Sequence, residues 1–397
     1  MSYTERRSTD HTDGLTPPHS VAAVAIPEQE IGRETLPDFA MSTRRGTLQT
    51  SGELLPVTED ECQAIARERG SIVVGMLPFD PDEKPLLCVP ERFTWSSRDA
   101  AFLARSETAR PTSVIGYDSQ LYRDAVTSAV ARIHEGSLQK VVLSRALELV
   151  YDAHGLKPGA VYRNLLAQNP SAYVFTVRDP STGEYVMGAS PELVVGVHDG
   201  QCSTHPLAGS ASRQIASGPT EDAQAGEALL KSAKDRAEHA TVVQDVAARL
   251  EPLCESLSVP PAPTLVATPQ LWHLGTPMSG RLKHGITALD AARAIHPTPA
   301  ICGMPRAAAL EIIREVEPYE RGYYGGLVGW MDADGNGEWA LNLRSGRVGA
   351  RRATLCAGAG IVDGSTAAGE HHETAIKLST FLAALGLRLE DVDALAR

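Results

Sequence analysis

Short runs of β-branched and aromatic residues recur along this chain of 397 residues, with stretches of helical length between them. The runs 172–179 and 185–189 are separated by Pro-Ser-Thr-Gly, which is typical of a hairpin. The run 192–197 precedes His-Asp-Gly and another strand-like segment, so a further hairpin is expected. Strand blocks interleaved with helices predict a mixed α/β or α+β fold with a large, mostly antiparallel sheet system.

Three segments carry helical signals. Residues 118–134 have apolar side chains at a helical spacing after a possible Asp or Ser cap. Residues 223–253 are rich in Ala, Leu, Val and Glu and predict one long helix. Residues 367–385 predict a final helix, with Gly386 just beyond its end as a C′ residue.

Charge and cysteine usage exclude several classes of protein. The net charge is −12 and basic residues are not clustered, which argues against a nucleic-acid partner. The six cysteines form no C-x-x-C pair, which favours a reducing compartment. No signal peptide or membrane-length apolar run occurs, so a cytoplasmic protein is expected. Residues 1–45 are expected to be a disordered leader and 46–397 one composite domain.

Acidic residues three apart occur in two of the predicted helices. Glu370 and Glu373 share a helical face with Lys377, and Asp235 and Glu238 are spaced in the same way. Each set taken alone is typical of a solvated face. If the two helices met, the repulsion among four carboxylates would require a bound cation, and all-oxygen ligands favour Mg²⁺.

Two further residues have an environment suited to proton transfer. Lys140 begins an apolar strand-like run, and a desolvated lysine has a lowered pKa and can act as a base. Glu192 lies between apolar strand-like runs, where a raised pKa would let it act as a general acid. Alternatively, the Lys140 side chain extends along apolar surface with its ammonium group in water, and Glu192 is an ordinary glutamate at the edge of a strand.

Two glycine-containing segments have simpler interpretations. Residues 332–337 match the opening of a calcium loop, but Leu343 stands where its twelfth-position glutamate belongs, so a hairpin turn is favoured. In 355–365, Gly358 and Gly360 would let the backbone approach an anion, although on these residues alone a plain tight turn is favoured.

Ten motifs in order resemble the chorismate-utilising enzymes, a family of isochorismate, salicylate, anthranilate and aminodeoxychorismate synthases. The motifs are KVVLSR, GASPEL, HPLAGSASR, KDRAEH, LWHLGTPMSG, HPTPAICGMP, EPYERGYYGGLVGW, LNLRSG, CAGAGIV and GEHHETAIKLS. The resemblance implies an α+β chorismate-binding fold, like that of anthranilate synthase component I. It is expected to be one large composite domain in which two mostly antiparallel sheets pack together and are flanked by helices.

The resemblance also implies roles for individual residues. Glu238 and Glu373 would ligate Mg²⁺, which binds the ring carboxylate of chorismate, with Asp235 and Glu370 as water-mediated partners. Lys140 would activate water and Glu192 would protonate the leaving hydroxyl. The substrate-binding residues would be Gly209, Ser210, His273, Ala300, Tyr324, Arg344, Gly358 and Lys377. The adjacent His371 and His372 would have no role.

Within the family, a few positions favour isochorismate synthase. Lys140 matches enzymes that use water, and Ala208 replaces the lysine nucleophile of aminodeoxychorismate synthases. Ser210 stands where salicylate synthases tend to carry Thr. Gly275 departs from the Ala of many isochorismate synthases, so salicylate synthase stays an alternative. The product is expected to feed a 2,3-dihydroxybenzoate siderophore, with menaquinone as the other pathway, and a monomer is expected.

Overall fold

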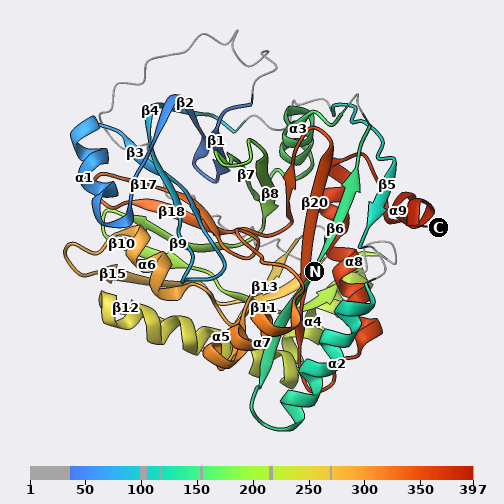
Figure 1. Cartoon of the computed structure of the whole chain (residues 1–397). Helices are drawn as coiled ribbons and strands as arrows, with labels where there is room; N and C mark the ends of the chain where they lie inside the picture. The colour runs from blue at the N-terminus through green and yellow to red at the C-terminus, as the bar shows by residue number, and fades with distance from the viewer. Residues whose placement is uncertain are drawn as a thin grey trace, which may run out of the picture.

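The computed structural model describes residues 36–98, 105–116, 119–152, 155–213, 218–268 and 271–396 (Figure 1). The strands are β1 (Phe39–Thr43), β2 (Gly46–Pro56), β3 (Ile72–Leu77), β4 (Leu86–Ser96), β5 (Ser113–Ile115), β6 (Lys140–Val150), β7 (Tyr173–Arg178), β8 (Tyr185–Ser190), β9 (Leu193–His198), β10 (Gln201–Thr204), β11 (Leu207–Ser212), β12 (Cys254–Ser258), β13 (Thr264–Ala267), β14 (Leu271–Gly275), β15 (Met278–Leu282), β16 (Gly303–Met304), β17 (Leu327–Asp332), β18 (Gly337–Leu341), β19 (Ser345–Val348) and β20 (Arg352–Ile361). The helices are α1 (Glu59–Arg69), α2 (Gln120–His134), α3 (Pro158–Gln168), α4 (Pro219–Lys231), α5 (Ala233–Leu250), α6 (Ala288–Ile295), α7 (Arg306–Val316), α8 (Ala367–Ala384) and α9 (Leu389–Ala396).

Antiparallel pairing organises the strands. In the described part of the chain, seventeen strands form one hydrogen-bonded network, and β11, β14 and β13 form a separate three-stranded sheet. The predicted hairpins β7–β8 and β9–β10 are present, and residues 332–337 make the turn between β17 and β18. The predicted α+β fold class, a large antiparallel sheet system flanked by helices, is confirmed.

Strands β6 and β20 form a long antiparallel pair, which positions the candidate site described below. Ten consecutive pairs connect them, from Ile361 opposite Val141 to Arg352 opposite Val150. The two strands run side by side along one flank of the molecule (Figure 1). Lys140 therefore lies at one end of β6, close to the residues of this strand that pair with Gly358 and Gly360 of β20.

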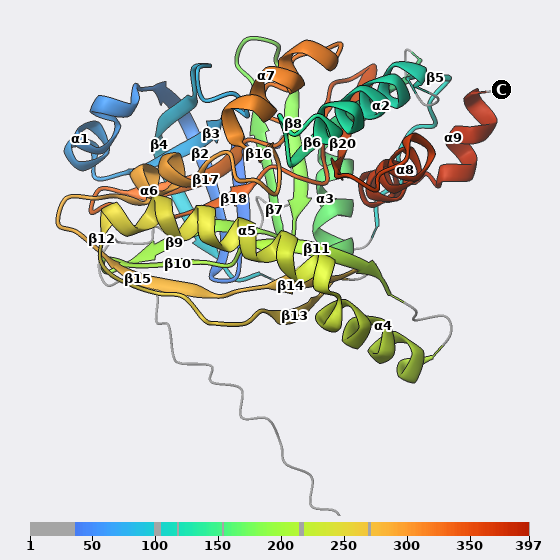
Figure 2. The same cartoon turned by 90° about the horizontal axis from the view of Figure 1, so that it is seen from below.

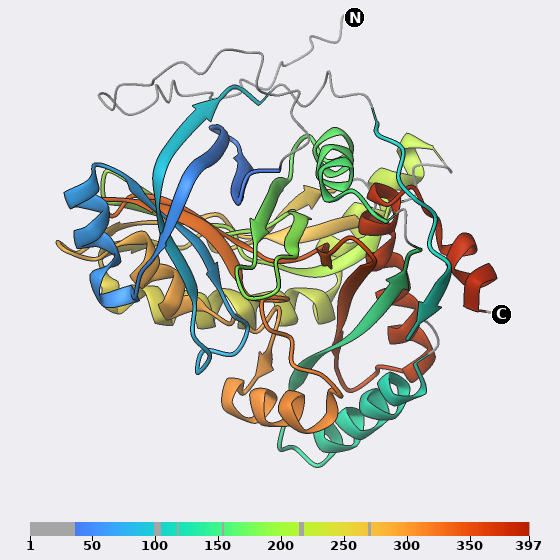
Figure 3. The ribbon, with the colours of Figure 1, turned by 45° about the horizontal axis from the view of Figure 1, so that its top comes forward.

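Helices cover the two sides of this strand pair. Helix α8 packs on β20 and α2, whereas α2 and α7 both contact β6 (Figure 3). Helix α5 packs against β11, β12 and β14, and α4 leads into it at an angle (Figure 2). The two helices predicted to carry acidic pairs, α5 and α8, thus approach the β6–β20 pair from different sides.

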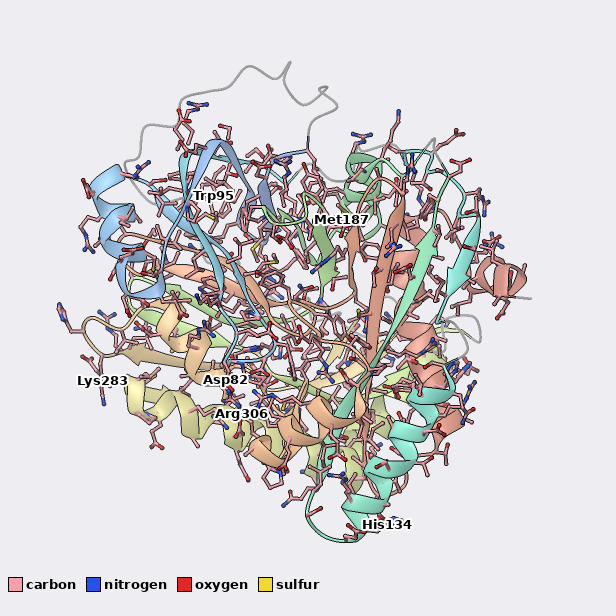
Figure 4. All side chains as sticks on the ribbon, in the orientation of Figure 1. Asp82, Trp95, His134, Met187, Lys283 and Arg306 are labelled. Carbon is pink, nitrogen blue, oxygen red and sulfur yellow. The ribbon has the colours of Figure 1, made fainter. Side chains whose placement is uncertain are left out.

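Apolar side chains fill three clusters of the core. The largest lies among β3, β6, β9, β17 and the helices α2, α5, α6 and α7. A second lies between α3, α8 and the far ends of β6 and β20, and includes the fully buried Met187 (Figure 4).

His134 and Lys283 lie at the edges of the molecule in the same view. No helix among the described residues is long and apolar enough to span a membrane.

Two expectations about the elements need correction. The predicted leader extended to residue 45, but β1 begins at Phe39, is fully buried and pairs with β2 and β7. Residues 1–35 lie outside the described residues. The predicted single helix over 223–253 is two helices, because Ser232 leaves the helical conformation and its side chain caps α5.

Candidate active site

The ammonium group of Lys140 meets a carboxylate from the middle of the chain. Lys140 Nζ donates to Glu238 Oε1 at 2.6 Å, and the lysine side chain is only 12% exposed. Lys140 begins β6, and Glu238 lies in the second turn of α5. The contact joins residues 98 positions apart in the sequence and holds the start of β6 next to α5.

A second lysine–glutamate pair comes from α8. Lys377 Nζ donates to Glu373 Oε1 at 2.7 Å and to the carbonyl oxygen of Gly358 at 2.9 Å. Burial lowers the pKa of Lys377, and the nearby charge of Glu373 opposes this effect. The predicted helical face is therefore turned toward β20, and α8 is held against the glycines of that strand.

The two pairs belong to one site. A Cβ atom at Gly360 on β20 would lie 3.0 Å from Lys140 Cε, so the lysine passes directly over that glycine. Lys140 also acts electrostatically on Lys377, as Lys234 of α5 acts on Glu370 of α8. The acidic turns of α5 and α8 therefore converge on the same end of the β6–β20 pair.

The acidic residues carry the type of ligand atom that a hard cation prefers, but their side chains are not arranged around a common point. Burial raises the pKa of Glu370, a Ser365 hydrogen bond opposes this, and the charge of Glu373 adds to the rise. Carboxylate oxygens are the ligands that Mg²⁺ prefers. Among the residues that the structure describes, however, no three His, Cys, Asp or Glu side chains are close enough to hold a metal ion. Glu238 and Glu373 each contact a lysine instead.

Glu192 is buried in the site. It is 7% exposed at the turn between β8 and β9, and its backbone is held by Ser190 and Leu341. Burial raises the pKa of its carboxyl group to about 8, and a Leu207 backbone hydrogen bond and the charge of Lys140 only partly oppose this. A carboxyl group with this pKa is mostly protonated at neutral pH and can donate a proton.

The three-stranded sheet contributes one wall of the site. Gly209 on β11 has φ +78°, and a Cβ there would lie 3.2 Å from Asp235 Cβ. Ser210 Oγ lies 2.7 Å from His273 Nδ1 on β14. Burial lowers the pKa of His273 to about 4, as do the charges of Arg344 and Lys377, so this imidazole is neutral. His273 Nε2 is buried without a hydrogen-bond partner among the described atoms.

Arg344 and Tyr324 face this wall. Arg344 has φ +50°, an uncommon backbone conformation for an arginine, and its guanidinium group interacts with the charge of Glu373. Burial lowers the pKa of Arg344 below its usual value. Tyr324 is 8% exposed and Ala300 is half-buried. Arg344, Lys377 and Lys140 are the basic side chains of the site, and both lysines also contact glutamates. The planar guanidinium group of Arg344 suits a carboxylate ligand.

The Gly358 backbone faces the same way as the Lys377 ammonium. Gly358 pairs with Ser144, which gives its N–H group to Glu317 on the opposite edge of β6. In an antiparallel ladder this makes Gly358 and Ser144 a non-hydrogen-bonded pair, so both polar backbone groups of Gly358 point away from β6. The predicted anion-receiving amide is therefore turned toward Lys377.

The remaining sequence expectations can also be placed. His371 packs near the Tyr122 ring, with the ring centroids 6.3 Å apart. Two hollows of about 260 and 410 Å³ are lined by other residues, beside Asp38 and Gln168 respectively. Sequence reasoning missed the Lys140–Glu238 pair and a buried Glu317–Arg321 pair, although the second lies in the EPYERGYYGG motif.

Comparisons with known proteins show the family of this chain. Residues 91–386 match the family model described as chorismate binding enzyme. The isochorismate synthase EntC of Escherichia coli K12 is 39% identical over 327 residues, which cover 80% of this chain and 82% of EntC. The vibriobactin-specific isochorismate synthase of Vibrio cholerae is 37% identical over 335 residues, 84% of this chain and 82% of the relative. The crystal structure of DhbC from Bacillus anthracis has a TM-score of 0.80 at 35% identity, covering 88% of this chain and 96% of that one.

Proposed function

Since the chain belongs to the chorismate-binding enzyme family, we propose that it is a Mg²⁺-dependent isochorismate synthase whose site lies between α5, α8 and the β6–β20 pair. The observation that supports this most is the convergence of two acidic helical turns, remote in sequence, beside Lys140 and the glycines of β20. The buried Glu192 supplies the acid that the reaction needs.

The proposed substrate, chorismate, carries two carboxylates. Arg344 would receive the enolpyruvyl carboxylate through its planar guanidinium group. Lys377 and the Gly358 amide would also receive substrate carboxylates. Gly209, Ser210, His273, Ala300 and Tyr324 would line the ring pocket.

Two proton transfers make up the proposed reaction. Lys140 takes a proton from a water molecule whose oxygen forms a bond to C2 of the ring. The ring double bonds shift, and the C4–oxygen bond breaks as Glu192 protonates the departing hydroxyl group. One water is consumed and one released, so the reaction is an isomerisation. Each positioned acid or base contributes about 10²–10⁴-fold to the rate.

Glu238 and Glu373 would hold Mg²⁺, with Asp235 and Glu370 as its water-mediated partners. When bound, the ion would supply positive charge that polarises the ring carboxylate. Glu238 also contacts Lys140, so it has two competing partners in this proposal.

Salicylate synthase is the alternative because Gly275 stands where many isochorismate synthases carry alanine. Packing offers a separate reason for this glycine. A Cβ at Gly275 would lie 2.5 Å from His205 Nε2, 2.8 Å from Val266 Cγ2 and 2.9 Å from Leu207 Cδ2. An alanine would therefore force its neighbours to move, and the glycine is not evidence for lyase activity.

The experiment is to incubate the full chain with chorismate and Mg²⁺ and to separate the products by chromatography. Isochorismate alone is expected. Equimolar pyruvate and salicylate would favour the salicylate synthase, and no turnover would contradict both. The proposed use of the product is a 2,3-dihydroxybenzoate siderophore, with menaquinone as the other pathway. Relatives named vibriobactin-specific isochorismate synthase and putative isochorismate synthase MenF are 37% and 38% identical to this chain, so identity does not separate the two pathways. A cytoplasmic monomer completes the proposal, and light scattering tests its oligomeric state.

A further inference from the structure

One edge of β6 lacks a strand partner in its middle. Strand β20 occupies the other edge along ten residues. On this edge, β16 pairs only with Lys140 and Val141, and β5 pairs only with residues 148–150. Val142 N also donates to the carbonyl oxygen of Cys302 at 2.8 Å, next to β16. Beyond it, no described strand pairs with residues 143–147 on this side. Lys140, the proposed base, lies at the end of this interrupted edge.

A buried ion pair fills the gap beside Lys140. Ser144 N donates to Glu317 Oε1 at 2.6 Å, and Arg321 Nη2 donates to the carbonyl oxygen of Val142 at 2.6 Å. Glu317 and Arg321 also bind each other, and both side chains are 2% exposed. The pair thus satisfies a backbone donor and acceptor of β6, as a neighbouring strand would.

The same pair reaches two other parts of the site. Arg321 Nη1 donates to the carbonyl oxygen of Ile301 at 3.1 Å, next to Ala300 of the ring pocket. The backbone carbonyl of Arg321 accepts from Tyr324 N at 3.0 Å. Arg321 is therefore bonded to the strand of Lys140, to the loop of Ala300 and to the turn of Tyr324.

Tyr319 adds a hydroxyl group to this network. Its phenolic oxygen lies 2.8 Å from Ser144 Oγ, which also donates to Glu317 Oε1 and Oε2 at 3.0 and 3.1 Å. The Arg321 guanidinium lies 4.2 Å from the centre of the Phe79 ring. Every face of the ion pair is thus occupied by protein.

Stability alone does not account for a pair in this place. Desolvating two charges costs several kcal/mol per ion, and replacing such pairs with apolar side chains is often neutral. What the pair provides is a fixed geometry between three separate segments. We propose that Glu317 and Arg321 are positioning residues that hold Lys140 in line with the ring pocket, an inference that rests on the proposed function.

The substitution Glu317→Asp tests this inference. An aspartate is one methylene shorter, so it cannot bond Ser144 N and Arg321 together. We expect kcat to fall about 10- to 100-fold, since a displacement near 1 Å can cost 10²-fold. The KM for chorismate should change less than about threefold because the carboxylate-binding groups are untouched. Chorismate binding, measured by titration calorimetry, should keep a stoichiometry near one per chain.

The milder substitution Tyr319→Phe keeps the test decisive if Glu317→Asp does not fold. It removes one hydroxyl group, and a fall in kcat of about 3- to 10-fold with full binding stoichiometry is expected. The matched control is Glu59→Gln, which breaks the Glu59–Arg293 pair between α1 and α6, remote from β6. This control should lower the melting temperature without changing kcat.

The outcomes separate the two proposals. A fall in kcat that merely follows a fall in binding stoichiometry would show a structural role only and overturn the inference. Unchanged kcat in both variants would overturn it as well. A wild-type protein that makes no isochorismate would instead overturn the proposed function, and this inference with it.

Discussion

At the scale of single residues, the proposed acid and the proposed base lie in different environments. Glu192 is buried with apolar neighbours, and its pKa is raised to about 8. Lys140 lies 2.6 Å from a carboxylate on another helix. The proposed role of Glu192 follows from its surroundings, since burial favours the protonated form of a carboxyl group. The proposed role of Lys140 as base rests on the family resemblance.

Replacing Lys140 tests the role of base. For Lys140→Ala we expect turnover to fall by about 10²–10⁴-fold because no group remains to take the proton of water. Chorismate binding should persist, since Arg344 and Lys377 are unchanged. Product chromatography and binding calorimetry measure the two effects. Lys283→Ala, at the edge of the molecule, is the control, and turnover retained by Lys140→Ala would rule out this role.

The pH dependence of the rate tests Glu192. The acid form of a group with a raised pKa is present below that pKa and is lost as pH rises through it. Activity should therefore decline above pH of about 8. Rates measured between about pH 6 and 10 should show this decline in the wild type. Glu192→Gln should be slower at every pH and should lack the decline. An unchanged decline in Glu192→Gln would assign it to another group.

The sequence identified single residues better than their contacts. Lys140, Glu192, Glu238 and Glu373 were each marked by residue type and local pattern, and family resemblance supplied their roles. The Lys140–Glu238 pair joins positions 98 apart, and no local pattern predicts that distance. Glu317 and Arg321 are four residues apart, a spacing that surface pairs also have, and only their burial distinguishes them.

At the scale of elements, the break between α4 and α5 matters most. Composition predicted one continuous helix, because a single serine is tolerated in a helix interior. In the structure Ser232 has an extended conformation, and its Oγ accepts from Asp235 N at 3.3 Å. The break lets α5 begin just before Asp235 and Glu238, which places both in its first two turns.

Removing this cap tests the link between α5 and the site. Ser232→Ala should lower the free energy of unfolding by about 1 kcal/mol, the usual value of an N-cap. It should also weaken Mg²⁺ binding, because the first turn of α5 carries Asp235. Ser119→Ala removes the matching cap of α2, where Ser119 Oγ accepts from Tyr122 N, and should cost similar stability without affecting Mg²⁺. Equal Mg²⁺ affinities in the two variants would contradict this link.

Hairpins and terminal helices were predictable, and long-range pairings were not. The hairpins β7–β8 and β17–β18 follow from turn residues between strand-like runs. By contrast, β3 pairs with β17, so Ile72 lies opposite Asp332. Local periodicity carries no information on such a partner. The buried β1 was missed for the same reason, since its apolar residues follow a long polar segment and its partners lie elsewhere.

At the scale of the whole molecule, the fold brings four remote segments to one place. The β6–β20 pair supplies Lys140 and the glycines, α5 and α8 supply the carboxylates, and the small sheet supplies Ser210 and His273. Ligands that bind these segments together should stabilise the entire fold by mass action. Chorismate and Mg²⁺ added together should raise the melting temperature more than the sum of their separate effects. Thermal unfolding with each ligand alone provides the control.

The most direct test of the account is Mg²⁺ binding, measured by titration calorimetry in the presence of chorismate. The wild type should bind one ion per chain, and Glu238→Gln and Glu373→Gln should each weaken binding at least about 10-fold, because the two helices share the ion. The exposed Glu390→Gln should bind as the wild type does. Wild-type affinity in either Glu238→Gln or Glu373→Gln would contradict a site shared by α5 and α8.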